Sequence, residues 1–125
     1  MLDNKIQKDD IVHFLDLVNS SYSPNFKLGH SKIGKPKPYY KILKEEYVDS
    51  LEYQSFIKVY LFSRHVLNEQ ELYVLNHTYG VSGEFYKGTQ IAKMLNLSNT
   101  RIRAVRVKGE QKISTFLRKQ LNKVH

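Results

Sequence analysis

Apolar residues recur at helical spacing over most of this 125-residue chain, and the pattern predicts an all-α fold. The first helix is expected to begin at Asp9 or Asp10, either of which can cap it, and to run to about Asn19. The residues that would form its buried face are Ile11, Phe14, Leu15 and Val18. Serines and a proline follow at once and predict the end of this helix.

A second helical segment is expected from residue 39 to about residue 64, as one long helix or as two helices joined near Asp49 and Ser50. Its first half carries an apolar stripe formed by Tyr40, Leu43, Tyr47 and Leu51. From Phe56 onward the segment is apolar on more than one side. This predicts either burial on several sides or a homodimer interface along the helix.

The next helix has recognisable start and stop signals. Asn68 and Glu71 have the spacing of a capping box, in which each side chain satisfies the other residue's backbone N–H. Gly80 is suited to the left-handed conformation that closes a helix. Between them, Leu72, Leu75 and Tyr79 are expected to face inward, and residues 81–87 are expected to form a loop.

Residues 88–108 predict a helix, a sharp turn and a second helix. Small Ala92 would allow the two helices to cross closely, and Asn96 can adopt the left-handed backbone of the turn. Ser98 would cap the second helix, whose inward positions are Ile102 and Val105. This is the spacing of a DNA-binding helix-turn-helix. The outward face of the second helix is expected to carry Asn99, Thr100, Arg103 and Arg106.

The same helix is expected to continue beyond Lys108. An apolar stripe is maintained by Ile113, Phe116, Leu117 and Leu121. Gly109 lies inside this helix, where glycine costs about 1 kcal/mol relative to alanine. Its presence there indicates either a bend or close packing against another element.

Positive charge is concentrated at the C-terminal end of the sequence. The net charge is +8, from 20 Lys and Arg against 12 Asp and Glu. Residues 1–86 carry ten basic and eleven acidic residues, whereas residues 87–125 carry ten basic residues and one acid, Glu110. Such segregation predicts a face that binds a polyanion.

A second basic stretch, loop 20–38, contains glycines, prolines and lysines and no acid. It leaves two interpretations open, a basic arm that touches nucleic acid and a solvated linker. The chain has no cysteine, no apolar run that approaches a membrane span and no signal-peptide core at its start. We therefore expect a soluble cytoplasmic protein without a disulfide framework.

The segments 67–81 and 90–113 resemble region 4 of bacterial sigma-70 factors. The resemblance depends on Tyr79-Gly80, on Ile91-Ala92-Lys93, on Leu95, and on Arg101-Ile102-Arg103 with Lys108 and Lys112 following. It implies that the helix starting at Ser98 is a recognition helix. The chain departs from the family at Asn99-Thr100, where a charged pair is usual, at Ala104, where Gln is frequent, at Gly88, where Leu is preferred, and at Glu110, where an apolar residue is preferred.

The first 66 residues do not resemble sigma region 2, which binds the core polymerase and opens the −10 element. In size the chain is more similar to the small phage and mobile-element regulators of the ArpU type. This divides the sequence into an N-terminal helical region, 1–66, and a DNA-binding domain, 67–125.

Catalytic and metal motifs are missing from the sequence. None of the five histidines forms an i, i+4 ligand pair on one helix, and HExxH, CxxC, GxSxG and Walker sequences do not occur. We predict that the chain is not an enzyme and needs no cofactor.

We predict a sequence-specific regulator of transcription that places helix 98–108 in the major groove of double-stranded DNA. The expected base contacts are Asn99, Thr100 and Arg103, because Asn pairs with adenine and Arg with guanine. The expected phosphate contacts are Thr89, Lys93, Arg101, Arg106, Lys108 and Lys112. Three alternatives stay open: a sigma-like subunit that acts only with RNA polymerase core, a phage DNA adaptor like a small terminase subunit, and a helical module that binds an acidic protein.

Overall fold

The computed structural model describes residues 6–18 and 37–123, and within these ranges the chain is helical without any strand. The five α-helices are α1 (Lys8–Leu17), α2 (Leu51–Ser63), α3 (Glu69–Tyr79), α4 (Gly88–Leu95) and α5 (Asn99–Lys123). Three short 3-10 helices join them: η2 (Pro38–Lys41), η3 (Glu45–Tyr47) and η4 (Arg64–Val66). The predicted all-α fold is confirmed. None of the described helices is long and apolar enough to cross a membrane.

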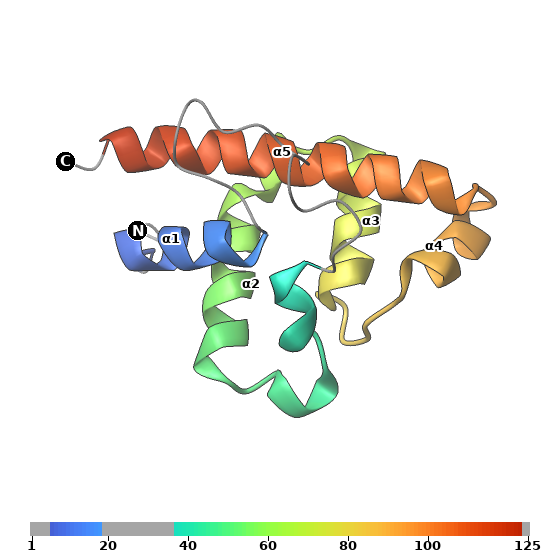
Figure 1. Ribbon diagram of the computed structural model, residues 1–125, viewed down its shortest axis with the longest axis horizontal. Helices are drawn as coiled ribbons and strands as arrows, with labels where there is room; N and C mark the ends of the chain where they lie inside the picture. The colour runs from blue at the N-terminus through green and yellow to red at the C-terminus, as the bar shows by residue number, and fades with distance from the viewer. Residues whose placement is uncertain (1–5, 19–36, 124–125) are drawn as a thin grey trace.

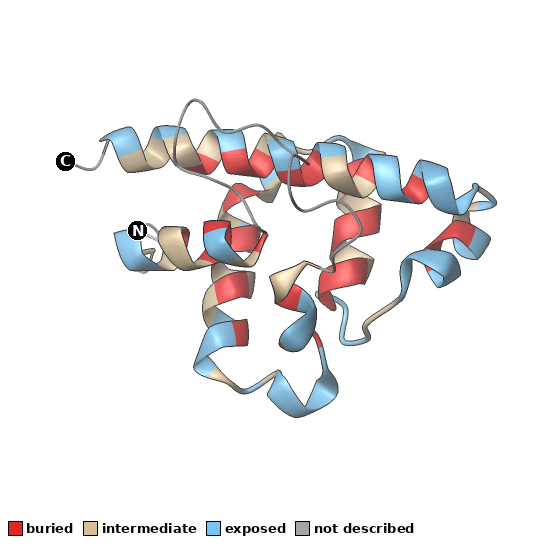
Figure 2. Ribbon diagram, in the orientation of Figure 1, coloured by how far each residue is buried: buried red, intermediate tan, exposed pale blue. Residues whose placement is uncertain are grey.

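The long helix α5 lies across one side of the molecule, with α1, α2 and α3 packed beneath it (Figure 1). The short helix α4 packs against the N-terminal end of α5. The turn around η3 forms the tip of the molecule farthest from α5 (Figure 1). This arrangement leaves the first turns of α5 beyond the main body of the fold, where they are mostly exposed (Figure 2).

Helix ends follow the capping signals in the sequence. The Asn68 backbone N–H donates to Glu71 Oε1 over 2.9 Å and the Glu71 N–H donates to Asn68 Oδ1 over 2.8 Å, so the predicted capping box is present. Gly80 closes α3 with a φ of 77°, as expected. The start of α1 differs from the prediction, because its N-cap is Gln7. Asp10 acts from inside the helix, where its carboxylate accepts the Gln7 N–H over 2.9 Å.

The prediction of a helix from residue 39 onward is wrong for its first half. Two 3-10 turns occupy that stretch, and α2 begins only at Leu51, where Ser50 Oγ accepts the Tyr53 N–H over 3.1 Å. The apolar stripe expected there is largely exposed: Tyr40 by 43%, Tyr47 by 40% and Leu51 by 87%. The buried residues of the stretch are Tyr39, Ile42 and Leu43. Long-range packing of Tyr39 therefore overrides the local periodicity.

The main core draws on both halves of the sequence. It combines residues of α1, η2 and α2 with Leu75, Tyr79, Ile113 and Leu117 from α3 and α5 (Figure 2). Aromatic rings make up its centre, where Phe14 stacks on Phe56 at 4.7 Å between centroids and Tyr79 meets Phe56 edge-on at 4.9 Å. Tyr53, Phe56, Val59 and Tyr60 of α2 are thus buried inside the chain, which is one of the two outcomes predicted for this helix, and Leu61 stays exposed by 43%. The homodimer interface stays a prediction.

Candidate nucleic-acid interface

Helix α4, a tight turn and the start of α5 form the predicted helix-turn-helix. Asn96 closes α4 in the left-handed region with a φ of 56°, the one non-glycine residue with positive φ in the described chain. The Arg101 N–H donates to Ser98 Oγ over 3.0 Å, which caps α5 as predicted. Ala92 is only 3% exposed, so the small residue lies at the helix contact. These features are confirmed in the positions that the sequence indicated.

A small second core holds this unit together. Its buried members are Val74, Ile91, Ala92, Ile102 and Val105, with Leu95 and Leu97 packed against them. Val74 comes from α3, so the helix-turn-helix is fixed to the preceding helix. Because Ile102 and Val105 point inward, the opposite side of α5 faces solvent.

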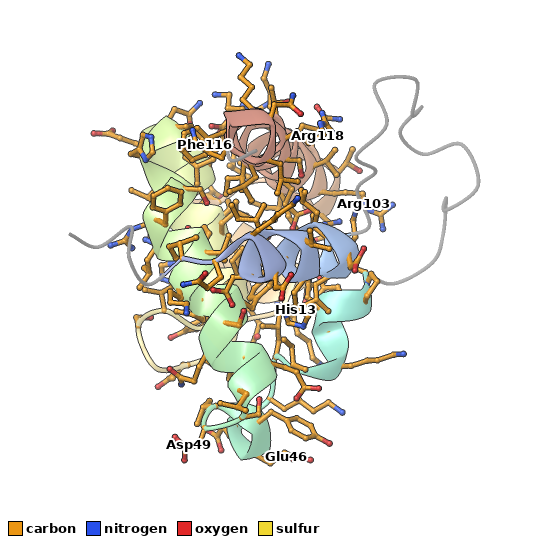
Figure 3. All side chains as sticks on the ribbon, turned by 90° about the vertical axis from the view of Figure 1, so that its left-hand side faces the viewer. His13, Glu46, Asp49, Arg103, Phe116 and Arg118 are labelled. Carbon is orange, nitrogen blue, oxygen red and sulfur yellow. The ribbon has the colours of Figure 1, made fainter. Side chains whose placement is uncertain are left out.

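The three predicted base-contact residues, Asn99, Thr100 and Arg103, are all exposed on the first turns of α5. Arg103 projects from the side of α5 toward solvent (Figure 3). Four of the predicted phosphate contacts are exposed as well: Thr89 and Lys93 on α4, and Arg101 and Lys108 on α5. A groove between α4 and α5 is lined by Thr89, Lys93, Asn96, Ser98 and Asn99. The structure therefore brings Thr89, Lys93 and Asn99 together at this groove, whereas Arg101 and Lys108 lie on the flank of α5 toward α3 and η4.

Lys87 is a further cation at this face that the sequence analysis did not select. It is exposed and precedes α4 directly, as the N-cap residue. The signal that would have identified it is its place at the start of the basic C-terminal segment.

Arg106 does not face solvent, contrary to the prediction. Its side chain is 17% exposed, and Nη1 donates to Glu110 Oε1 and to the Tyr39 hydroxyl, each over 2.9 Å. Arg106 lies one turn after the inward position Ile102 and one turn before the buried Glu110, so its guanidinium can reach across to η2. Arg106 is therefore not among the exposed cations that can contact phosphates.

Glu110 is the centre of this buried network. It is 5% exposed, and its Oε2 accepts the hydroxyls of Tyr39 and Tyr79 over 2.5 and 2.6 Å. Burial, together with the Glu110 carboxylate, raises the pKa of each of these two tyrosines well above the ordinary value of 10.0. Burial alone would lower the pKa of Arg106, but Glu110 and the neighbouring tyrosines together outweigh burial, and the pKa is raised. Glu110, where the sequence departs from the sigma-like pattern, is thus a buried polar residue whose two carboxylate oxygens both accept hydrogen bonds.

Lys112 is also engaged within the chain. Its ammonium lies 2.8 Å from Glu71 Oε1, and Glu71 is only 3% exposed. Lys112 retains 35% exposure, so it lies at the edge of the basic face but carries a structural ion pair. Lys112 is therefore primarily a structural cation.

The basic loop 20–38 lies outside the described residues except for Lys37 and Pro38. Lys37 is partly buried and donates to the Val18 carbonyl over 3.0 Å. Burial lowers its pKa, and the Glu110 carboxylate opposes that effect. Lys37 therefore joins α1 to η2, and it is not available as an arm contact.

Within the described ranges, no three His, Cys, Asp or Glu side chains cluster as metal ligands. His77 instead donates its Nδ1–H to the Tyr73 carbonyl, 2.7 Å away, and stacks on the Tyr73 ring. Comparison with known protein families, with curated proteins and with solved structures finds nothing that matches this chain. The interpretation of the site depends on its own geometry and charge.

Proposed function

We propose that this protein is a sequence-specific DNA-binding regulator of transcription that inserts the start of α5 into the major groove. The observation that supports this best is the exposed row Asn99, Thr100 and Arg103 on the outward side of a helix-turn-helix. A major groove admits a single α-helix, and these side-chain types read base edges by hydrogen bonds.

Four cations surround this row, and none of them forms an ion pair within the described residues. Lys87, Lys93, Arg101 and Lys108 are exposed on α4 and α5, and the described ion pairs involve none of them. Arg101 makes one exposed hydrogen bond to Gln70 Oε1, at 2.9 Å. In water such a contact contributes little, so Arg101 can exchange it for a phosphate.

The experiment that tests this function separates base reading from phosphate holding. Duplexes that bind the full chain are first selected from a random library, and their competition with random duplexes is then measured. Arg103→Ala should cost about 1–3 kcal/mol on the selected duplex and relax the preference at one base pair. Lys108→Ala should weaken selected and random duplexes alike, because Lys108 lies later on α5, where a recognition helix passes the backbone.

Both variants are compared at one salt concentration, since phosphate contacts make all affinities salt-dependent. Circular dichroism checks that each variant keeps the helical content of the wild type. An Arg103→Ala protein with an unchanged ratio of selected to random affinity would show that α5 is not placed in this way. Co-purification with RNA polymerase core, a stable oligomer larger than a dimer, or binding only to an acidic protein would favour the alternatives.

A further inference from the structure

A pocket of about 290 Å³ lies beside the recognition face, where η2 meets α4 and α5. Its lining includes Tyr40 of η2, Thr78 of α3, Lys87 and Thr89 at the start of α4, and Arg103 and Arg106 of α5. Tyr40 lies outside the segments that resemble sigma region 4, in the N-terminal half of the sequence. The site is therefore assembled from both halves of the chain.

The position of Tyr40 follows from how its neighbour is buried. Tyr39 is fully buried and donates its hydroxyl to Glu110 on α5. Successive residues of a 3-10 helix are turned by about 120°, so a buried Tyr39 directs Tyr40 along the surface of α5. The two rings meet edge-on with centroids 4.8 Å apart, which fixes the Tyr40 ring while 43% of the residue stays exposed.

The groups around the pocket fit a phosphate. Arg106 is neutralised by Glu110, while the cations of Lys87 and Arg103 are not balanced by a described ion pair. Tyr40 lines the pocket, and its hydroxyl acts electrostatically on Arg106, another lining residue. Within residues 6–18 and 37–123 no hydrogen bond of this hydroxyl is found. Tyrosine and threonine hydroxyls together with lysine are common donors to DNA phosphates.

We propose that this pocket holds a phosphate of the DNA backbone beside the bases read by α5, and that the Tyr40 hydroxyl donates a hydrogen bond to that phosphate. The inference depends on the proposed DNA-binding function and adds a contact from the N-terminal half. In this proposal the Tyr39–Glu110–Arg106 network contributes to DNA binding, because it holds η2 beside the exposed row Asn99, Thr100 and Arg103.

The test couples one hydroxyl to one phosphate. The full chain is titrated with the duplex selected above and with versions in which single phosphates are replaced by uncharged methylphosphonates. Tyr40→Phe removes the hydroxyl but keeps the ring on Tyr39, so the fold is retained. It should bind selected and random duplexes about three- to tenfold more weakly, since a phosphate contact carries no sequence preference.

At one phosphate, the methylphosphonate should weaken the wild type more than it weakens Tyr40→Phe, because the variant has already lost its hydroxyl contact there and loses only the attraction of the nearby cations. The matched control is Tyr47→Phe, which alters another tyrosine of a 3-10 helix, 40% exposed and located at the tip remote from α5 (Figure 1). This variant should follow the wild type at every methylphosphonate position. Melting temperatures of both variants exclude a general loss of stability.

Two outcomes overturn the inference and leave the proposed function intact. One is a Tyr40→Phe protein that binds like the wild type while Arg103→Ala loses its base preference. The other is a Tyr40→Phe penalty that adds to every methylphosphonate penalty, since the hydroxyl then contacts no phosphate. A wild-type chain that selects no duplex at all would instead overturn the proposed function, and this inference with it.

Discussion

Two buried carboxylates tie α5 to the rest of the molecule, each through its own set of partners. Glu110 accepts hydrogen bonds from Tyr39, Tyr79 and Arg106, and Glu71 accepts from Asn68 and Lys112. An ionised carboxylate is tolerated inside a protein only when such partners replace water. Glu71 also retains the simpler helix-capping role that its sequence position indicates.

The ion pair of Glu71 predicts a pH-dependent contribution to stability. Burial acts to raise the pKa of Glu71, but the Lys112 ammonium and the Asn68 N–H outweigh it, so the pKa lies below the ordinary value of 4.5. The contribution is therefore complete above pH 4.5 and is lost as the pH falls through the depressed pKa of the folded state. Lys112→Ala should lower the free energy of unfolding by about 1–3 kcal/mol at pH 7, because it leaves a buried carboxylate short of a partner.

Urea unfolding at pH 7 and at pH 3 measures this effect. The difference between Lys112→Ala and the wild type should shrink at pH 3, because the contribution of ionised Glu71 declines as the pH falls below 4.5 toward its depressed pKa. Lys119→Ala, an exposed lysine on the same helix, is the control and should change stability by less than about 0.5 kcal/mol. A Lys112→Ala cost that is equal at both pH values would contradict the role given to this ion pair.

Sequence periodicity predicted correctly, at most positions of α5, which side chains face inward and which face solvent. The prediction for Arg106 is wrong for a specific reason. The inward positions Ile102 and Val105 are nearly fully buried, at 3% and 5% exposed, and Arg103 is exposed, as expected. Arg106 lies at the boundary of the two faces, where a long side chain can turn either way. Its direction is decided by Glu110 one turn later and by Tyr39, 67 residues away in sequence. The second partner is not visible in any local pattern.

Helices α3 and α5 approach each other closely at Gly109. A Cβ atom at this position would lie 3.1 Å from Leu75 Cδ1 and 3.4 Å from Glu71 Cβ. Leu75 is fully buried, so it has little space into which it can move. Of the two explanations that the sequence allowed for this glycine, close packing is confirmed.

Gly109→Ala should destabilise the fold although alanine is the better helix former. The gain in helix propensity is about 1 kcal/mol, whereas overpacking a core contact costs about 1–3 kcal/mol, so a net loss of about 1 kcal/mol is expected. Gly88→Ala is the matched control, because its Cβ would meet only Ile102 Cγ2, at an ordinary 3.9 Å. Thermal unfolding of both variants should lower the melting temperature for Gly109→Ala alone. Equal stabilisation by the two substitutions would show that α3 and α5 are not so close.

Helix boundaries were predictable where short-range chemistry sets them. Asn68, Gly80, Asn96 and Ser98 all act at the ends where the sequence placed them. The stretch 39–50 was not predictable in this way, because its apolar residues fit a helical stripe. The side chain that decides its structure is Tyr39, which must reach Glu110 on a distant helix. Local pattern and long-range packing disagree there, and packing determines the conformation.

For the molecule as a whole, the shared core bears on the predicted division at residue 66. Leu75, Tyr79, Ile113 and Leu117 belong to the proposed DNA-binding domain, yet they are buried together with residues of α1, η2 and α2. A fragment of residues 67–125 would expose these side chains to water. Far-UV circular dichroism during heating should therefore show one cooperative transition for the full chain and none for the fragment. A fragment that melts cooperatively near the temperature of the full chain would support two independent domains.

The acids at the tip and the cations of α5 lie on opposite sides of the molecule. This separation of charge suits a single polyanion-binding side. Glu46 and Asp49 lie at the tip, whereas Arg103 and Arg118 project from α5 at the other side (Figure 3). The exposed tip also includes Glu45 and Glu52. DNA bound along the start of α5 would thus keep its phosphates away from these four exposed acids, which lowers repulsion at the bound face.

This distribution predicts how affinity for duplex DNA depends on salt. Five exposed cations on or next to the helix-turn-helix lack a described ion pair: Lys87, Lys93, Arg101, Arg103 and Lys108. If their charges neutralise about five phosphates, Arg103 from within the groove and the others by direct contact, the logarithm of the binding constant should fall linearly with the logarithm of the salt concentration. The expected slope is roughly −4 to −5. Adding Arg106 and Lys112, which the sequence also suggested, would steepen the slope to about −6.

Fluorescence anisotropy of a labelled random duplex, measured from low to physiological salt, gives this slope. Lys108→Ala should make it shallower by about 1, because one phosphate contact is lost. Lys44→Ala, which removes an exposed lysine from the stretch that leads to the tip, should leave the slope as it is. A slope near zero would refute DNA binding through this face. A slope near −6 that Arg106→Ala reduces would show that the Arg106–Glu110 pair opens when DNA binds.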